Sequence, residues 1–359
     1  MARHIVLGAG AGGIGRSVAH ALISAGEDVV LVSRSDRDLG PDGATAVALD
    51  VTDETRLADL ATGARTIVNA LNPSAYTHWE RDWPPMAKAV LAAAERSGAG
   101  LITVSNLYGY GLVDGPITER TALRPNGVKG HVRVEMWEQA LAAHAAGRAR
   151  VSEVRASDYI GPATLGTSLV SGMLIKPILK GRSPWLTMGR VDAPHSWTYD
   201  GDVAALVRAL ALSDGDADWG RAWHVPTDAP ATFAQLGEEV ATITGAKARP
   251  VHVMPRSMVT VGGLVVPLLA ELRETRHQFE RPFVLDSSDA QARFELAPTP
   301  RHTAWRRRWQ LCVPPGSRAE LRFGAVRNAD RPERRSSAET RPRVGQPKSD
   351  SLSAFLASK

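Results

Sequence analysis

A glycine-rich turn near the start of the chain constrains the fold more than any other stretch. The apolar run His4–Leu7 leads directly into the turn 8–15 (GAGAGGIG), and apolar residues of the following segment, 16–26, recur at helical spacing. This order of strand, turn and helix leaves backbone N–H groups at a helix N-terminus, where they favour a pyrophosphate. We therefore predict a dinucleotide-binding turn. A purely structural glycine turn is the alternative.

The glycines fit the spacing GxGxxG in two overlapping frames, 8-10-13 and 10-12-15. Either frame provides the tight turn, the close backbone approach and the close helix packing that a dinucleotide requires. The residues predicted to contact the cofactor here are Gly8, Gly10, Gly13, Ile14 and Gly15.

The tip of the second predicted strand, Asp28–Ser33, indicates which dinucleotide is bound. An acid at this position holds the ribose hydroxyls of NAD, whereas an arginine accommodates the additional phosphate of NADP. Here Ser33 and Arg34 occupy the tip, and no acid occurs before Asp36. We predict that Ser33 and Arg34 contact NADP, the preferred cofactor. NAD stays the alternative, because Arg34 can also be a solvated loop side chain.

Strands and helices alternate along the first 105 residues. Further strands are predicted at 45–50, 65–72 and 101–105, with helices at 53–61 and 75–98 between them. This alternation predicts right-handed βαβ units and an α/β fold with a Rossmann-type, doubly wound parallel sheet. Ligands of such sheets lie beyond the carboxyl ends of the strands, where the sequence places Gly8, Ser33, Asp50, Ala70 and Ser105.

Several motifs, in this order, resemble the extended short-chain dehydrogenase/reductases and, more narrowly, the NAD-dependent epimerase/dehydratase family. They are the glycine turn, Asp50-Val51, Asn69-Ala70, and the segments 104–111, 155–162 and 199–204. The resemblance implies an NAD(P)-binding Rossmann domain at 1–160. It also implies a small C-terminal α/β substrate domain at 161–313, with the chain returning to the sheet near 192–226.

The resemblance also assigns cofactor contacts. Asp50 and Val51 are expected near the adenine, Ala70 and Leu71 along the cofactor, and Tyr159 at the nicotinamide end.

The chain departs from the family pattern where the chemistry is expected. The family places a serine or threonine after the fifth strand and a Tyr-x-x-x-Lys motif on the next helix. Here Ser105 and Asn106 stand at the serine position, and the next helix, around 125–135, contains no tyrosine. Lys129 and Arg133 have the i,i+4 spacing of the missing pair and therefore share one helix face.

Two interpretations of this departure remain. In the first, Lys129 is a proton donor, because burial and the neighbouring Arg133 both favour loss of an ammonium proton. Tyr108 or Tyr110, both on the loop after the fifth strand, supplies the missing phenol. Ser105 and Asn106 complete the candidate catalytic set with Tyr108, Lys129 and Arg133. In the second, Lys129 and Arg133 only bind phosphates of the cofactor or substrate.

Two more side chains are candidates for substrate contact. Tyr110 follows the fifth strand, and His195 lies in the segment 192–199, which matches the substrate-facing segment of the family. An ordinary loop histidine is the alternative for His195. The histidines do not cluster, and the chain has no HExxH, CxxC or GxSxG motif, so no metal site is predicted.

Composition narrows the class of protein. The single cysteine, Cys312, excludes an internal disulfide, and no apolar run reaches the roughly 18 residues of a membrane span. With no stretch that reads as a signal peptide, we expect a cytoplasmic protein. The formal charge is +5, and residues 313–359 hold ten Lys or Arg against five Asp or Glu, so the tail carries the whole excess. We predict that 314–359 is a disordered basic tail and do not favour nucleic-acid binding.

The sequence therefore predicts an NAD(P)-dependent oxidoreductase or epimerase/dehydratase-like enzyme. Its substrate would be a small hydroxyl or carbonyl compound such as a sugar derivative. The rival hypothesis is a catalytically inactive NADP(H)-binding sensor, for which missing catalytic residues are expected. The expected partners are a small-molecule substrate and, at most, a second copy of the chain.

Overall fold

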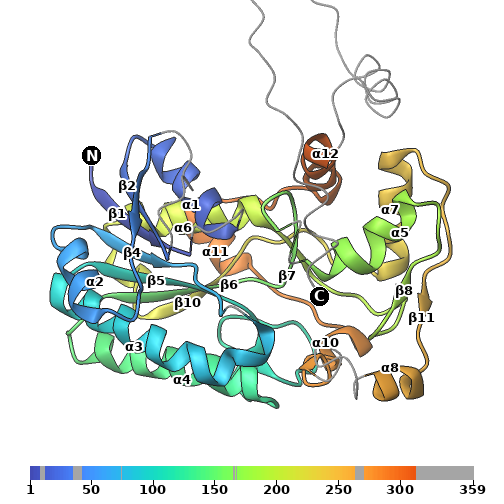
Figure 1. Ribbon diagram of the computed structural model, residues 1–359, viewed down its shortest axis with the longest axis horizontal. Helices are drawn as coiled ribbons and strands as arrows, with labels where there is room; N and C mark the ends of the chain where they lie inside the picture. The colour runs from blue at the N-terminus through green and yellow to red at the C-terminus, as the bar shows by residue number, and fades with distance from the viewer. Residues whose placement is uncertain are drawn as a thin grey trace, which may run out of the picture. The chain divides into compact units, whose positions relative to one another are not determined.

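The computed structural model is built on a seven-stranded parallel sheet with the order β10-β6-β5-β4-β1-β2-β3 (Figure 1). The order reverses between β1 and β4, as in Rossmann folds, so the predicted fold class is confirmed. The strands are β1 (Arg3–Leu7), β2 (Asp28–Ser33), β3 (Thr45–Ala48), β4 (Thr66–Asn69), β5 (Gly100–Ser105), β6 (Val151–Arg155) and β10 (Arg221–His224).

The structure describes residues 1–8, 13–34, 43–73, 75–164, 166, 168–262 and 271–312, with only the backbone beyond Arg306. The predicted basic tail and Gly10 lie outside these ranges. Residues Met1–Pro314 form one compact unit, and the division near residue 160 stays a prediction. No helix in the described part of the chain is long and apolar enough to cross a membrane.

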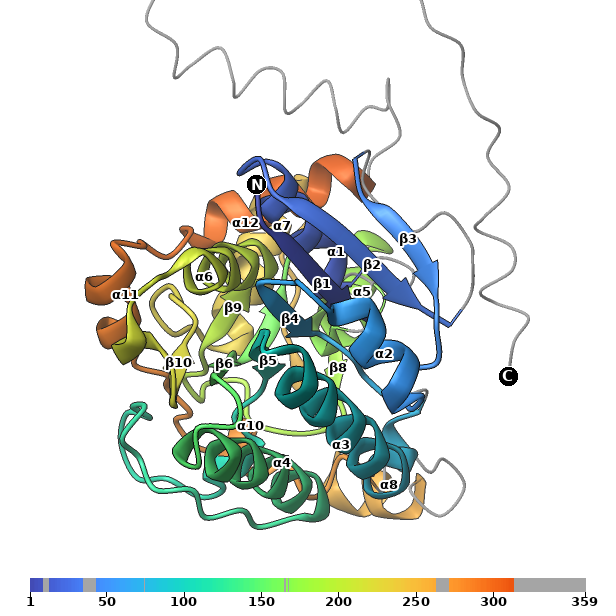
Figure 2. The same ribbon diagram turned by 90° about the vertical axis from the view of Figure 1, so that its left-hand side faces the viewer.

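Helices cover both faces of the sheet (Figure 2). On one face lie α1 (Ile14–Ile23) and α6 (Asp200–Leu212), and on the other α2 (Glu54–Ala61), α3 (Trp79–Ser97) and α4 (Val128–Ala145). Because successive strand residues point to opposite faces, each strand supplies both cores. Thus Val6 and Ile102 pack with α1 and α6, whereas Ile5 and Leu101 pack with α2, α3 and α4.

A second group of short elements surrounds a separate apolar cluster, which includes Trp197, Phe233 and Phe279. It contains two parallel strand pairs, β7 (Asp158–Ile160) with β9 (Trp197–Tyr199) and β8 (Trp185–Leu186) with β11 (His252–Val253). Among the described residues after β7, the helices other than α6 are α5 (Lys176–Leu179), α7 (Phe233–Thr244), α8 (Arg256–Gly262), α10 (His277–Glu280), α11 (Ser288–Phe294) and α12 (Arg301–Cys312). Single turns are η2 (Tyr76–His78), η3 (Tyr108–Tyr110), η4 (Ser171–Ile175) and η5 (Asp216–Asp218).

Local sequence signals account for several helix ends. The Asp53 side chain caps α2 by accepting a hydrogen bond from the Arg56 backbone N–H at 3.1 Å. Thr232 and Gln235 form a reciprocal capping box at the start of α7. Asp and Thr are residue types that favour the N-cap position, so the local sequence accounts for both helix starts.

Two predicted strands were wrong in extent. The strand at 45–50 ends at Ala48, and the Asp50 side chain accepts hydrogen bonds from Thr52. The strand at 65–72 covers only Thr66–Asn69, where the Asn69 side chain accepts from the Leu71 N–H. The apolar segment 168–179 forms a π-helical turn, Ser171–Ile175, followed by the short α5. Pro177 has no N–H to donate, which prevents a regular α-helical ladder there. The segment 256–279 contains α8 and α10, and its residues 263–270 are not described.

The end of β1 approaches the end of β4 so closely that only glycine fits. Gly8 has φ +85°, and a Cβ atom there would lie 2.3 Å from the Ala70 carbonyl oxygen. We predict that Gly8→Ala lowers the unfolding free energy by roughly 2–4 kcal/mol, combining left-handed strain with overpacking. Gly63→Ala is the matched control, since Gly63 has φ +74° but no neighbouring atom within 4 Å. Urea unfolding measures the unfolding free energy of both variants. An equal decrease in the two would contradict the close approach of Gly8 to Ala70.

Candidate functional site

The carboxyl ends of β1, β2 and β4 bring predicted cofactor residues to one edge of the sheet. Gly8 follows β1, and the exposed Arg34 follows Ser33, the last residue of β2. Ala70 follows β4, where its N–H donates to the Leu7 carbonyl at 3.1 Å. The Leu71 N–H donates to the Asn69 side chain at 3.2 Å, which turns the chain away from the sheet. The predicted contacts are therefore gathered along one edge.

The start of α1 fits an anionic group. Gly13 is the N-cap residue, its position has no side-chain hydrogen bond, and the first turn contains no acid. The first N–H groups of an α-helix have no partner within the helix, and a pyrophosphate satisfies them in dinucleotide folds. Gly15 is buried against the core. The described part of the turn, including Ile14, therefore fits a dinucleotide.

Arg34 lies within electrostatic range of two acids. Asp50 accepts hydrogen bonds from the Thr52 backbone N–H at 3.0 Å and from the Thr52 hydroxyl at 2.8 Å. These bonds, and to a smaller extent the Arg34 charge, lower the pKa of Asp50. Arg34 also contributes to lowering the pKa of Asp82, although the Arg81 hydrogen bond is the main cause. Val51, next to Asp50, is buried.

Lys129 is buried on the first turn of α4, and its ammonium is already engaged. The Nζ atom donates hydrogen bonds to the carboxylates of Glu271 and Glu274, and only 3% of the side chain is exposed. The same atom lies 4.5 Å from the centre of the Tyr76 ring. Lys129 therefore ties α4 to the segment that precedes α10.

Arg133 lies one turn further along α4 and has no ion pair among the described residues. Its guanidinium lies 4.2 Å from the Trp83 ring centre and 5.0 Å from that of Trp79. Its Nε and Nη1 atoms are buried without a hydrogen-bond partner in the described part of the chain. Burial lowers the pKa of this guanidinium. Two aromatic faces replace the carboxylate that a buried arginine normally requires.

Two tyrosines form a hydroxyl pair beside Lys129. The Tyr76 hydroxyl donates to the Tyr108 hydroxyl at 2.9 Å. Burial raises the pKa of both phenols, and the negative charge of Asp158 raises each further. Both hydroxyls therefore stay protonated near neutral pH, and Tyr108 is available as a hydrogen-bond donor.

Ser105 and Asn106 support the turn that carries Tyr108. Ser105 ends β5 and is buried, and the Asn106 side chain accepts a hydrogen bond from the Tyr108 backbone N–H at 3.0 Å. Ser105, Asn106, Arg133 and Glu153 share the lining of a cavity of about 10 Å³. This volume is about one water molecule. The predicted catalytic residues Ser105, Asn106 and Arg133 thus lie together.

His195 pairs with Asp158, which sequence reasoning did not single out. His195 is 1% exposed, and its ring stacks on Phe279 at 4.6 Å between centres. Its Nε2 atom lies 2.9 Å from the Asp158 carboxylate and its Nδ1 atom 3.0 Å from the Gln278 carbonyl. A neutral imidazole has only one N–H, but both nitrogens face acceptors. The Asp158 carboxylate and the Gln278 carbonyl therefore hold the His195 ring in a fixed orientation, with the Ser157 hydroxyl 3.4 Å from Nε2.

Tyr110 belongs to a separate buried network. Its hydroxyl accepts a hydrogen bond from Arg155 at 2.7 Å and lies 2.7 Å from His224 Nε2. His224 Nδ1 lies 2.7 Å from the Asp286 carbonyl, so Nδ1 carries the proton and Nε2 accepts from Tyr110. Tyr110 and His195 are each 1% exposed, and a contact with substrate, as predicted from the sequence, requires them to become uncovered.

The tertiary structure adds four residues that the sequence did not indicate: Tyr76, Asp158, Glu271 and Glu274. Of these, only Asp158 could have been identified from the sequence, because it lies within the motif at 155–162, directly before Tyr159. Burial raises the pKa of Tyr159. Within the described ranges, no three His, Cys, Asp or Glu side chains group as ligands for a metal.

A comparison with models of protein families identifies the family of this chain. Residues 5–223 match the model of the NAD dependent epimerase/dehydratase family, which is more than half of the chain. The protein therefore belongs to this family. No sequence among the curated proteins compared with it is similar enough to count as a match.

Solved structures of similar fold include enzymes that act on sugar nucleotides. One is the dTDP-glucose 4,6-dehydratase of Bacillus anthracis in complex with NAD, with a TM-score of 0.69 and 16% identity, covering 86% of this chain and 96% of that one. Another is the UDP-glucose 4-epimerase of Thermotoga maritima with UDP-glucose, with a TM-score of 0.68 and 17% identity, covering 90% and 99%. At these identities the likeness shows the fold.

The buried His224 predicts a pH dependence of stability. Burial lowers its pKa from 6.5 to about 4, so between these values the unfolded chain binds more protons than the folded one. The unfolding free energy should therefore fall by up to about 3 kcal/mol as the pH drops from 6.5 to 4. Urea unfolding of the wild type and of His224→Gln over this range measures the difference. Identical pH slopes would contradict the assignment.

Proposed function

We propose that the protein is an NADP-preferring enzyme that oxidises, epimerises or dehydrates a hydroxyl-bearing small molecule of the sugar-nucleotide kind. The observation that carries this proposal is the alignment of Gly8, Arg34, Asp50 and Ala70 along one sheet edge, next to the uncapped start of α1. Similar folds that hold NAD together with UDP-glucose or UDP-glucuronic acid support the substrate class.

In this proposal, a bound dinucleotide supplies a nicotinamide that accepts and returns a hydride. The turn and the start of α1 bind its pyrophosphate, and Arg34 binds the 2′-phosphate of NADP. Asp50 and Val51 lie beside the adenine, Ala70 and Leu71 lie along the cofactor, and Tyr159 is at the nicotinamide end. These roles follow the family resemblance and the strand ends on which the residues lie.

Tyr108 is the proposed proton carrier. Its oxygen accepts from Tyr76, which leaves its own hydrogen for a substrate oxygen. Asp158, which pairs with His195 and whose carboxylate is partly exposed, is the proposed group that exchanges protons with the tyrosine pair. The charges of Asp158 and Arg133 both act on Tyr108, with opposite effects on its pKa.

Lys129 has a different role in this proposal from that of a free proton donor. Two carboxylates already accept from its ammonium, so it holds the segment 271–276 against α4 and below Tyr76. A proton donor requires reach to the reacting atom, and a doubly paired ammonium lacks that freedom.

The second candidate function is a cofactor-binding sensor without turnover. Arg133 favours it, because this side chain lies against Trp79 and Trp83 instead of in an open cleft. Incubation with NADP or NAD and a panel of UDP-glucose, dTDP-glucose, UDP-glucuronic acid and simple ketones tests both functions. Turnover supports the enzyme. Dinucleotide binding without turnover of any panel member favours the sensor.

Arg34 determines the cofactor preference in this proposal. Arg34→Ala should weaken NADP binding by tenfold or more and leave NAD binding within about twofold, because only NADP loses a charge-assisted contact. Titration calorimetry with both dinucleotides measures this. Arg56→Ala, a change of the same charge on α2, is the control. A wild type that prefers NAD would rule out this assignment.

Variants of Tyr108 and Lys129 distinguish a residue that transfers a proton from one that holds the chain in position. Tyr108→Phe should lower kcat by a hundredfold or more with little change in dinucleotide affinity, since the proposal gives this hydroxyl a role in proton transfer and none in cofactor binding. Lys129→Met should mainly lower the unfolding free energy, because it leaves two carboxylates facing each other. The double variant Lys129→Met/Glu274→Gln should recover part of that stability. Unchanged kcat in Tyr108→Phe, together with loss of turnover in Lys129→Met at full folding, would instead assign the proton transfer to Lys129.

A further inference from the structure

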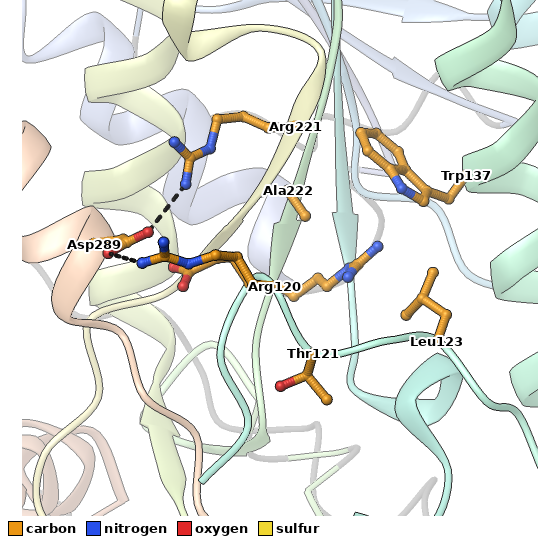
Figure 3. A pocket seen from close by; sticks show the side chains of 9 residues that line it. Arg120, Thr121, Leu123, Trp137, Arg221, Ala222 and Asp289 are labelled. Carbon is orange, nitrogen blue, oxygen red and sulfur yellow. Dashed lines mark hydrogen bonds and ion pairs between the residues drawn. The ribbon is translucent and has the colours of Figure 1, made fainter.

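A cavity of about 460 Å³ lies over β6 and β10, beside α4 (Figure 3). Its lining comes from the segment between β5 and α4, from both strands, from α4 and from α11. None of the residues assigned above to the cofactor, to proton transfer or to substrate contact lines it. A cavity of this size accommodates a small organic ligand rather than a single ion.

Positive charge converges on this cavity from three separate elements. Arg120 comes from the segment before α4, Arg155 from the end of β6 and Arg221 from the start of β10. Arg120 and Arg221 share one carboxylate, Asp289, at 3.8 and 3.3 Å (Figure 3). A single carboxylate between two guanidinium groups leaves an excess positive charge on this wall.

Arg155 is held in a fixed orientation before any ligand arrives. Its Nε atom donates to Glu153 at 2.6 Å, and its Nη1 atom donates to the Tyr110 hydroxyl at 2.7 Å. In the described part of the chain, its Nη2 atom has no hydrogen-bond acceptor. A buried guanidinium whose orientation is already set binds an anion with little loss of side-chain entropy.

The second acid of the cavity is Glu119. Its side chain is 6% exposed, and its carboxylate accepts a hydrogen bond from the His224 backbone N–H at 3.1 Å. Burial raises the pKa of this carboxyl. The lining thus holds three guanidinium groups and two carboxylates, so its formal charge is positive.

The wall that carries Trp137 and Leu123 is largely apolar, and the Arg155 guanidinium lies 5.6 Å from the centre of the Trp137 ring. Figure 3 shows Trp137 of α4 and Leu123 facing Arg221 and Asp289 across the cavity. An apolar wall opposite a cationic wall is complementary to a ligand that has a hydrophobic body and an anionic end.

We propose that this cavity binds a small molecule in which a carboxylate or phosphate is attached to an apolar ring. The oxyanion lies between Arg155, Arg120 and Arg221, and the ring lies against Trp137 and Leu123. Guanidinium groups bind both oxyanions through paired N–H donors, so this chemistry covers both. The site is independent of the proposed function.

Titration calorimetry with three probes tests the proposal: phenyl phosphate, benzoate and the neutral benzamide. The titrations use the full chain in the presence of saturating NADP, so that the predicted cofactor edge is blocked. At least one anionic probe should bind at least tenfold more tightly than benzamide. The stronger of phenyl phosphate and benzoate identifies the oxyanion.

Variants of the lining arginines test whether the anionic probe binds in this cavity. The double variant Arg120→Gln/Arg221→Gln should weaken binding of the anionic probe by tenfold or more. The single variant Arg120→Gln carries little risk to folding, because the Arg120 side chain is 85% exposed. Arg124→Gln is the matched control, because it is exposed on the same segment but does not line the cavity. Binding that these variants leave unchanged, equal binding of benzamide, or no binding of either anion at millimolar concentration would overturn the proposal.

Discussion

The parallel pairing of β1 with β2 and with β4 is the constraint on which the rest of the structure depends. Leu7 is paired with Val32 on one side and with Asn69 on the other, so the three strands end in step. For this reason Gly8, Ser33 and Ala70 emerge at one edge. A shift of one residue in either register would move these backbones by about 3.3 Å and exchange the core-facing side chains. The position of the predicted cofactor edge is thus a consequence of hydrophobic register.

Two buried cations on α4 are stabilised in different ways. Lys129 has two carboxylates from a segment about 140 residues later in the chain, and Arg133 has two indole rings from α3. Both cations lose hydration on burial. Coulomb attraction to the carboxylates offsets part of this cost for Lys129, and attraction to the indole rings offsets part of it for Arg133. The i,i+4 spacing placed both on one helix face but did not indicate these partners.

Tyr110 connects two regions of the molecule. Through Arg155 and His224 it joins the ends of β6 and β10, and through η3 it is two residues from Tyr108. The Asn106 side chain holds the same turn from its other end. A tyrosine proposed to transfer a proton therefore lies on a turn that is fixed at both ends, which restricts its hydroxyl to a narrow range of positions.

The sequence by itself determined the fold class, the order of strands and helices through β5, and the strand ends at which the cofactor residues lie. These depend on local periodicity, glycine spacing and capping residues such as Asp53 and Thr232, and all of them act over a few neighbouring residues. Only the tertiary structure decided what the candidate residues contact. Asp158 meets His195 across 37 residues, Lys129 meets Glu271 across 142, and Tyr110 meets His224 across 114. Such contacts are set by how the packed layers bring distant segments together, and no local pattern in the sequence encodes that distance.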